Sequence, residues 1–308
     1  MPSIGPGGPS VPLPISEFGG KGRTLRGDAW RRLCKNKLAL VALGWIIFVI
    51  VIAVSADLWV PRVLGNPIEI DTTTVAQMSL NAPSSAHPFG TDFAGRDIAS
   101  RVIYGARVSL MVGVVAVAIM VLLGLIAGAF AAYYGGWWDA IIMRTADIFF
   151  AFPYILFAIV LLALLGNGIQ NVFIAIGILG WPSIARVFRG SVLFVKENEY
   201  VDAARAMGAS TPRIVFRHIM PNAIAPIIVY ATMSVGGAIL TEAALSFLGM
   251  GVQLPKPSWG GMLSEAQTYM TSAPWLMLYP GLAILTTVLA FVLLGDGLRD
   301  ALDVKMKG

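Results

Sequence analysis

Apolar residues fill six long stretches of the chain, and polar or charged segments separate them. A helix needs about 20 predominantly apolar residues to cross a bilayer, and each stretch is close to that length. We therefore expect six membrane-spanning helices, at Leu38–Val54, Val108–Ala132, Ala140–Leu165, Asn171–Val192, Ala223–Met250 and Trp275–Leu294. Pro153 interrupts the third span and Pro182 the fourth, which is tolerable where neighbouring helices satisfy the freed carbonyl groups.

The composition supports an all-α transmembrane fold. Of the 308 residues, 57% are hydrophobic and 13% are charged, with a mean hydropathy of +0.76. A soluble domain of this length needs more polar surface. Residues 1–37 are rich in Pro, Gly and Ser at first and basic later, so they are expected to form a flexible tail, and they lack the residue order of a signal peptide.

The distribution of basic residues predicts the orientation. Seven Lys and Arg residues precede the first span, namely Lys21, Arg23, Arg26, Arg31, Arg32, Lys35 and Lys37. By the positive-inside rule this places the N-terminus in the cytoplasm. Counting through the six spans puts Ser55–Arg107 and Gly251–Pro274 outside, and Glu197–Asn222 and the C-terminus inside. The sequence therefore predicts a multi-pass protein of the cytoplasmic membrane with both termini cytoplasmic.

Several kinds of chemistry are not expected. The single cysteine, Cys34, cannot form an internal disulfide, and the two histidines, His87 and His218, lie far apart, so we expect no metal site. The net charge is +5, but the basic residues cluster beside the spans, so the charge does not indicate nucleic-acid binding. The sequence has no GxxxxGK[ST] phosphate loop, so the chain itself is not expected to bind ATP or another cofactor.

Glu197–Asn222 is a compact polar segment between two apolar spans, and it reads as two short helices. Asn198 is placed to cap the first helix, and Gly208 is placed to end it in the left-handed conformation. Pro221 is expected to close the second helix, and Asn222 to cap the fifth span.

The first short helix has a face of small residues. Ala203, Ala206 and Met207 fall on one side by their spacing, flanked by Asp202 and Arg205. Such a face allows close approach of another protein, with the two charges fixing the register. On composition alone, a solvated loop with incidental helicity is an equal alternative.

The residues Asp202-Ala203-Ala204, then Gly208, then Pro221 after Ile219-Met220 resemble the EAA loop of ABC importer permeases. That pattern reads Glu-Ala-Ala, three residues, Gly, nine residues, Ile-x-Leu-Pro; this chain has Asp202 for Glu, His218 for Ile and Met220 for Leu. The resemblance implies a coupling helix that docks into a groove on an ATP-hydrolysing subunit. The residues implied are Glu199, Tyr200, Asp202, Ala203, Ala204, Arg205, Ala206, Met207, Gly208 and Pro221.

Further stretches resemble the permeases of dipeptide, oligopeptide and nickel importers. They include "HPFGTDFAGRDIASRVIYGARVSLMVG", "YYGGWWDAIIMRTADIFFAFP" and "EAALSFLGMGVQLPKPSWGGML", and the resemblance covers about Arg31–Val304. It implies a MetI-like type I permease core. The expected division is a tail at 1–37, a first helix with an external loop at 38–106, and a five-helix core at 107–308 that contains the coupling loop 197–222.

The resemblance also implies partners, in a bacterial or archaeal membrane. They are a second homologous permease, two ATP-binding subunits that hold ATP and Mg²⁺, and an extracytoplasmic solute-binding protein. The chain would form half of a path for di- or oligopeptides; nickel or another small solute is the alternative within the class. A channel that works without an ATPase is an alternative of a different class. A membrane enzyme is not favoured, because the sequence shows no convergent set of catalytic residues.

Three charged residues within the spans are candidates for the path or a gate. Arg144 and Asp147 are three residues apart in the third span, where they form either an internal ion pair or a substrate contact. Glu242 lies roughly 27 Å along the fifth span at 1.5 Å per residue. It either meets a peptide's amino terminus or caps or pairs with a neighbouring group.

Two external segments are also informative. "GTDFAGRD" at 90–97 could coordinate a cation, but turn structure with internal pairing of Asp92 and Arg96 is favoured. Tyr104 and Arg107, which follow it, are expected at the membrane interface. The loop Gly251–Pro274 either contacts the binding protein or is a plain packed loop.

Overall fold

The protein is an all-helical bundle in the computed structural model, which describes residues 25–66, 68, 78–166, 168–210, 213–252 and 255–302. Most of the predicted tail, residues 1–24, lies outside the described residues. The α-helices are α1 (Leu25–Leu33), α2 (Lys37–Val63), α4 (Ile98–Tyr134), α5 (Gly136–Ala151), α6 (Tyr154–Leu165), α7 (Ile169–Lys196), α8 (Glu199–Ala206), α10 (Met220–Ala223), α11 (Ala225–Phe247), α12 (Trp259–Ala266) and α13 (Trp275–Leu302). A π-helix, η2 (Ile214–Ile219), and a 3₁₀ turn, η3 (Gln267–Tyr269), complete the set.

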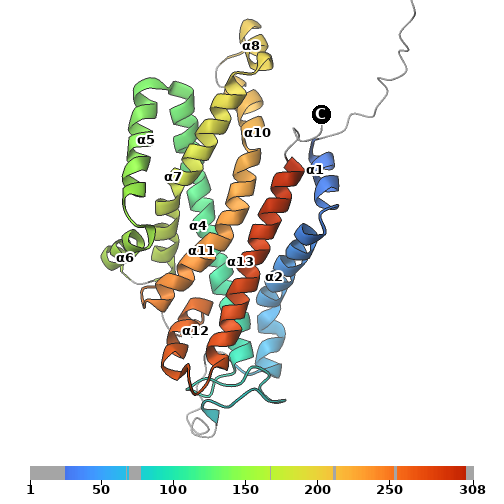
Figure 1. Ribbon diagram of the computed structural model, residues 1–308, viewed down its shortest axis with the longest axis vertical. Helices are drawn as coiled ribbons and strands as arrows, with labels where there is room; N and C mark the ends of the chain where they lie inside the picture. Colours follow the sequence, from blue (N-terminus) through green and yellow to red (C-terminus); the bar gives the residue numbers. More distant parts are fainter. Residues whose placement is uncertain are drawn as a thin grey trace, which may run out of the picture.

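The two ends of the bundle differ. Short polar helix α8 projects from one end, where the first and last described helices, α1 and α13, also terminate (Figure 1). Helix α12 lies at the opposite end, together with the segment that leads into α4 (Figure 1). We refer to these as the α8 end and the α12 end.

Five described helices are long and apolar enough to span a membrane, and α5 with α6 makes a sixth candidate when the pair is counted together. Each predicted span therefore has a helical counterpart. Three run further than expected, and the first of them continues to Val63. The second begins at Ile98 because Asp97 caps α4, accepting from the Ser100 amide at 2.8 Å, and no proline breaks the amphipathic stretch that follows. The sixth continues to Leu302.

The third span is not one straight helix. Helices α5 and α6 meet at an angle of 93°. Phe152 has extended backbone angles, which is the conformation favoured before a proline, and Pro153 (φ −59°) is the N-cap of α6. The sequence located this interruption correctly, but the chain turns there instead of continuing through a kink. In consequence α6 packs across α7 at the side of the bundle (Figure 1).

Helices α4 and α7 form the most extensive contact in the core. Glycines make this possible, because a Cβ at Gly124 would lie 2.4 Å from Cβ of Ile184, and one at Gly128 would lie 2.6 Å from the Ala185 carbonyl oxygen. The two backbones therefore approach more closely than side chains would permit. This contact fixes α7, which leads directly to α8.

Candidate functional site

Helix α8 is the first part of the predicted coupling segment, and it has the expected bounds. Asn198 occupies the N-cap position, but its side chain forms no cap bond; its Nδ2 donates to the Val195 carbonyl at 3.0 Å. The expectation that this side chain caps α8 is wrong, because it is used to close the end of α7. Gly208 ends the helix with φ +78°, as predicted.

The two faces of α8 are distinct. Val201 and Ala204 are buried, and Val201 belongs to the same apolar core as Ile214 and Ile219 of η2. Ala203, Ala206 and Met207 are exposed, with Met207 82% accessible. Glu199 and Tyr200 are also exposed. The small-residue face is therefore open, while the opposite face attaches α8 to the bundle.

The flanking charges on α8 pair with each other. Arg205 Nη1 donates to Asp202 Oδ1 at 2.7 Å, and both side chains are exposed. An exposed pair of this kind contributes little to stability, so it remains available to reorganise against a partner.

The second part of the coupling segment differs from the prediction. Pro221 does not end a helix, because Arg217–Phe247 runs as one helical stretch of 31 residues. Proline has no N–H, so the ordinary bond to the Arg217 carbonyl is missing, and the preceding turns adopt π geometry, with the Met220 amide bonded to the Val215 carbonyl. Asn222 Nδ2 donates to the His218 carbonyl at 2.7 Å, inside this stretch, so it does not cap α11.

A cavity of about 870 Å³ lies between α7, α11 and α13. Helix bounds place it toward the α8 end, since its lining includes Asn222 and Arg299. Its other polar lining comes from Ser191 and Tyr230, and Gly190 leaves space on α7 where a Cβ would meet nothing within 4 Å.

Arg144 and Asp147 form the expected internal pair, at 3.7 Å between Nη1 and Oδ2. The structure adds a third member that the sequence did not suggest, since Arg186 of α7 also donates to Asp147. Arg186 lies over the Phe150 ring, 4.2 Å from its centroid. This trio, Arg144, Asp147 and Arg186, is called the α5–α7 charge group below.

Glu242 is fully buried where α11, α4 and α12 meet. Its carboxylate accepts from the hydroxyls of Ser246 at 2.7 Å and Ser109 at 3.2 Å. Ser109 in turn accepts weakly from the Trp259 amide, at 3.4 Å. Among the described residues the carboxylate faces packed protein and forms no ion pair with an arginine, and it does not border the 870 Å³ cavity.

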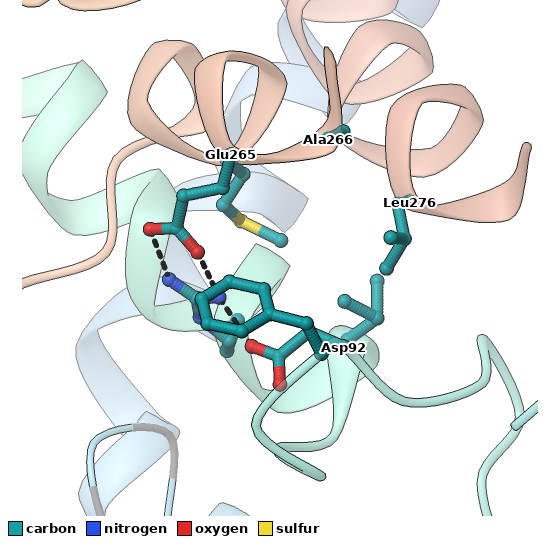
Figure 2. A pocket seen from close by; sticks show the side chains of 8 residues that line it. Asp92, Glu265, Ala266 and Leu276 are labelled. Carbon is teal, nitrogen blue, oxygen red and sulfur yellow. Dashed lines mark hydrogen bonds and ion pairs between the residues drawn. The ribbon is translucent and has the colours of Figure 1, made fainter. Parts of the chain in front are cut away.

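A buried charge cluster lies at the α12 end (Figure 2). Arg101 Nη1 and Nη2 donate to Glu265 Oε2 and Oε1 at 2.8 and 3.0 Å, and Nη1 also reaches Asp92 Oδ2 at 2.5 Å. Arg96 Nε donates to the same Asp92 oxygen at 2.7 Å. The predicted Asp92–Arg96 pairing is confirmed, whereas Arg101 and Glu265 were missed. The cluster joins the segment before α4 to α12.

Tyr104 and Arg107 have a more specific role than interfacial anchoring. The Tyr104 hydroxyl donates to Asp57 Oδ1 at 2.8 Å, and Arg107 Nη1 donates to Asp57 Oδ2 at 2.9 Å. They therefore tie α4 to α2. The loop at 251–274 contains α12, whose Trp259 is buried and donates to the Val102 carbonyl at 2.9 Å. Among the described residues no group of three or more His, Cys, Asp or Glu could hold a metal ion.

Comparisons with known proteins identify the family. The model of the binding-protein-dependent transport system inner membrane component matches residues 120–308, and that of the N-terminal TM domain of oligopeptide transport permease C matches residues 24–83. The glutathione transport system permease protein GsiD of Escherichia coli O157:H7 is 47% identical over 286 residues, 93% of this chain and 92% of that protein. The dipeptide transport system permease protein DppC of Alkalihalophilus pseudofirmus is 48% identical over 280 residues, 91% of this chain and 90% of that protein.

The fold is found in a solved importer. A chain of the MetNI methionine ABC transporter, in an inward-facing conformation, matches with a TM-score of 0.55 and 20% identity, over 65% of this chain and 95% of that one. The expected type I permease core is thereby confirmed at the level of fold. The family models and the relatives at 47–48% identity show more than a shared fold. The chain belongs to the family of binding-protein-dependent transport system inner membrane components.

Proposed function

We propose that this chain forms half of the translocation path of an ABC importer for peptides and couples that path to ATP hydrolysis by partner subunits. The observation that carries the proposal is α8, a short polar helix whose small-residue face is open while Val201 and Ala204 fix it to the bundle. The names of the relatives, which mention dipeptide and glutathione transport, support small peptides as the solute class.

Coupling would follow a simple mechanical route. A partner ATPase that grips Ala203, Ala206 and Met207 moves α8 when its nucleotide sites close. The buried face of α8 packs on η2, which is continuous with α11, so the displacement reaches a spanning helix directly. ATP and Mg²⁺ belong to the partner subunits in this scheme. Their energy enters as a change in the relative stability of inward and outward states.

The proposed topology places the α8 end in the cytoplasm. Helix α1, which carries Arg31 and Arg32, and the terminal turn of α13 lie at this same end (Figure 1), in agreement with the positive-inside rule. The α12 end then faces a solute-binding protein, and a homologous permease supplies the other half of the path. The division into a tail at 1–37, a first helix with its loop at 38–106 and a core at 107–308 remains a prediction.

Ala203→Leu tests the coupling role. The new side chain is exposed, so the fold is retained, but it blocks close docking on the small-residue face. In nanodiscs that contain the complete complex with its binding protein, we expect peptide-stimulated ATPase activity to fall about tenfold or more, as a loss of ~1.4 kcal/mol of docking energy produces. Gly44→Leu is the matched control, because a Cβ at Gly44 of α2 meets nothing within 4 Å.

Each alternative function gives its own result. Normal coupling in Ala203→Leu contradicts the role of α8. If nickel stimulates the ATPase activity of the wild-type complex and peptides do not, the solute is nickel and not a peptide. Solute flux that persists when the ATPase subunits are omitted supports the channel.

A further inference from the structure

The α5–α7 charge group is exposed where a lipid-facing surface would be apolar. The side chains of Arg144, Asp147 and Arg186 are 85%, 48% and 45% accessible in the single chain. A second pair between the same helices behaves differently. Arg189 donates to both oxygens of Asp139 at 2.5 Å, and the two side chains are only 32% and 21% accessible. That closed pair is neutral and structural, whereas the α5–α7 charge group is open.

The position along the helices places this group inside the membrane. Arg144 lies eight residues after the start of α5 and Arg186 ten residues before the end of α7, or about 12 and 15 Å from the α8 end at 1.5 Å per residue. Both residues fall within the predicted apolar spans Ala140–Leu165 and Asn171–Val192, in the half nearer the α8 end. Charges at that depth almost always face protein or water. This surface of α5 and α7 is therefore not covered by lipid.

The cavity described above lies on a neighbouring face of α7, and its lining does not include Arg144, Asp147 or Arg186. Gly190, which lines it, is one helical turn from Arg186 on α7, and residues four apart share a helix face. The lining of the cavity includes polar side chains at its α8 end.

The charges of the group do not cancel. Two arginines accompany one carboxylate, which leaves a net charge of +1. Asp147 bonds Arg186, and Phe150 supports the guanidinium of Arg186 from one side. Arg144 has only the 3.7 Å contact with Asp147, beyond hydrogen-bond distance, among the interactions of the described residues. Its donors are oriented by the pair yet remain open to an anionic group.

We propose that the α5–α7 charge group is a carboxylate-binding site within the translocation path, where Arg144 and Arg186 contact the C-terminal carboxylate of the passing peptide. This inference rests on the proposed function, since it assigns a site to the peptide that the importer carries. Asp147 holds the two arginines in register and limits their affinity, which a path requires because the solute must leave again.

Transport of paired substrates tests the site. Uptake into proteoliposomes with the complete complex is measured for trialanine and for trialanine amide, each at a concentration that saturates the binding protein. We expect Arg144→Gln to lower uptake of the free acid about tenfold, as loss of a charge-assisted hydrogen bond would, and to leave the amide unchanged. Arg144→Lys restores part of the free-acid uptake. Equal losses for both peptides, or no loss for either, overturn the site.

Cysteine labelling tests the aqueous exposure separately. Cys34 is the single native cysteine, so Cys34→Ser gives a background without thiols. Arg144→Cys is expected to react with a charged, membrane-impermeant methanethiosulfonate at least tenfold faster than Ile126→Cys, because thiolates form in water. Ile126 is the matched control: it is 60% exposed and lies eight residues from the same end of α4. Equal rates overturn the proposal.

Two further outcomes separate this site from its alternatives. Loss of the partner permease on purification of Arg144→Gln assigns the group to the subunit interface and overturns the site. A wild-type complex that takes up neither peptide contradicts the proposed function, whereas Ala203→Leu abolishes uptake of both peptides when the function is right. The substrate-selective loss in Arg144→Gln is therefore distinct from a failure of coupling.

Discussion

Arg101→Met is expected to lower the free energy of unfolding by about 3–5 kcal/mol, the usual cost of breaking a buried ion pair. Arg101 is 1% exposed and holds Asp92 and Glu265 together through three hydrogen bonds. Methionine fills much of the volume but leaves both carboxylates close together with only Arg96 between them. The measurement is unfolding by dodecyl sulfate in mixed micelles, followed by tryptophan fluorescence.

Two companion variants make this prediction specific. Arg62→Met removes an exposed arginine at the end of α2 and should change the stability by no more than about 0.5 kcal/mol. Arg101→Met combined with Glu265→Met leaves the neutral Asp92–Arg96 pair, so it should be less destabilised than Arg101→Met alone. A double variant as unstable as the single one would show that volume, and not unpaired charge, is responsible.

Gly128→Ala is expected to destabilise the bundle by about 1–3 kcal/mol, although alanine is the better helix former. The added Cβ would lie 2.6 Å from the Ala185 carbonyl oxygen, which is backbone and cannot rotate away. Helices α4 and α7 must therefore separate along the contact that fixes α7. The same unfolding measurement reports the change, and weaker transport should accompany it.

Gly44→Ala is the internal reference for this effect. The chemical change is identical, but nothing lies within 4 Å of the added Cβ on α2. Stability should rise by up to about 1 kcal/mol from helix propensity. If Gly128→Ala and Gly44→Ala shift the unfolding midpoint in the same direction, the close packing of α4 against α7 does not determine the stability of the bundle.

The positions of the spans followed from hydropathy, because a bilayer imposes length and apolarity on any helix that crosses it. The angle at Pro153 did not follow. Proline excludes Phe152 from a helix, but whether the chain kinks or turns depends on what α6 packs against, and α7 supplies that surface. Gly208 was predictable for the opposite reason, since its left-handed conformation is a local property.

Charge partners were the least predictable part of the candidate site. Asp92 and Arg96 are four residues apart, so their pairing was visible in the sequence. Arg101 and Glu265 are separated by 164 residues, and Arg186 and Asp147 by 39, so only the packing of α12 and of α7 brings them together. An arginine on the buried face of an apolar helix was the one available signal that Arg101 had a partner.

The helical stretch Arg217–Phe247 has a mechanical consequence. Its 31 residues would span about 46 Å at 1.5 Å per residue if fully regular. In the coupling proposed above, this stretch would carry a displacement of about 1–2 Å from the α8 end to the region packed around Glu242. The buried hydrogen bonds from Ser109 and Ser246 to Glu242 would then hold α11 in place at the point about which it rotates. The π turns beside Pro221 lie near the α8 end. Their flexibility would therefore determine how much of a displacement of α8 reaches α11.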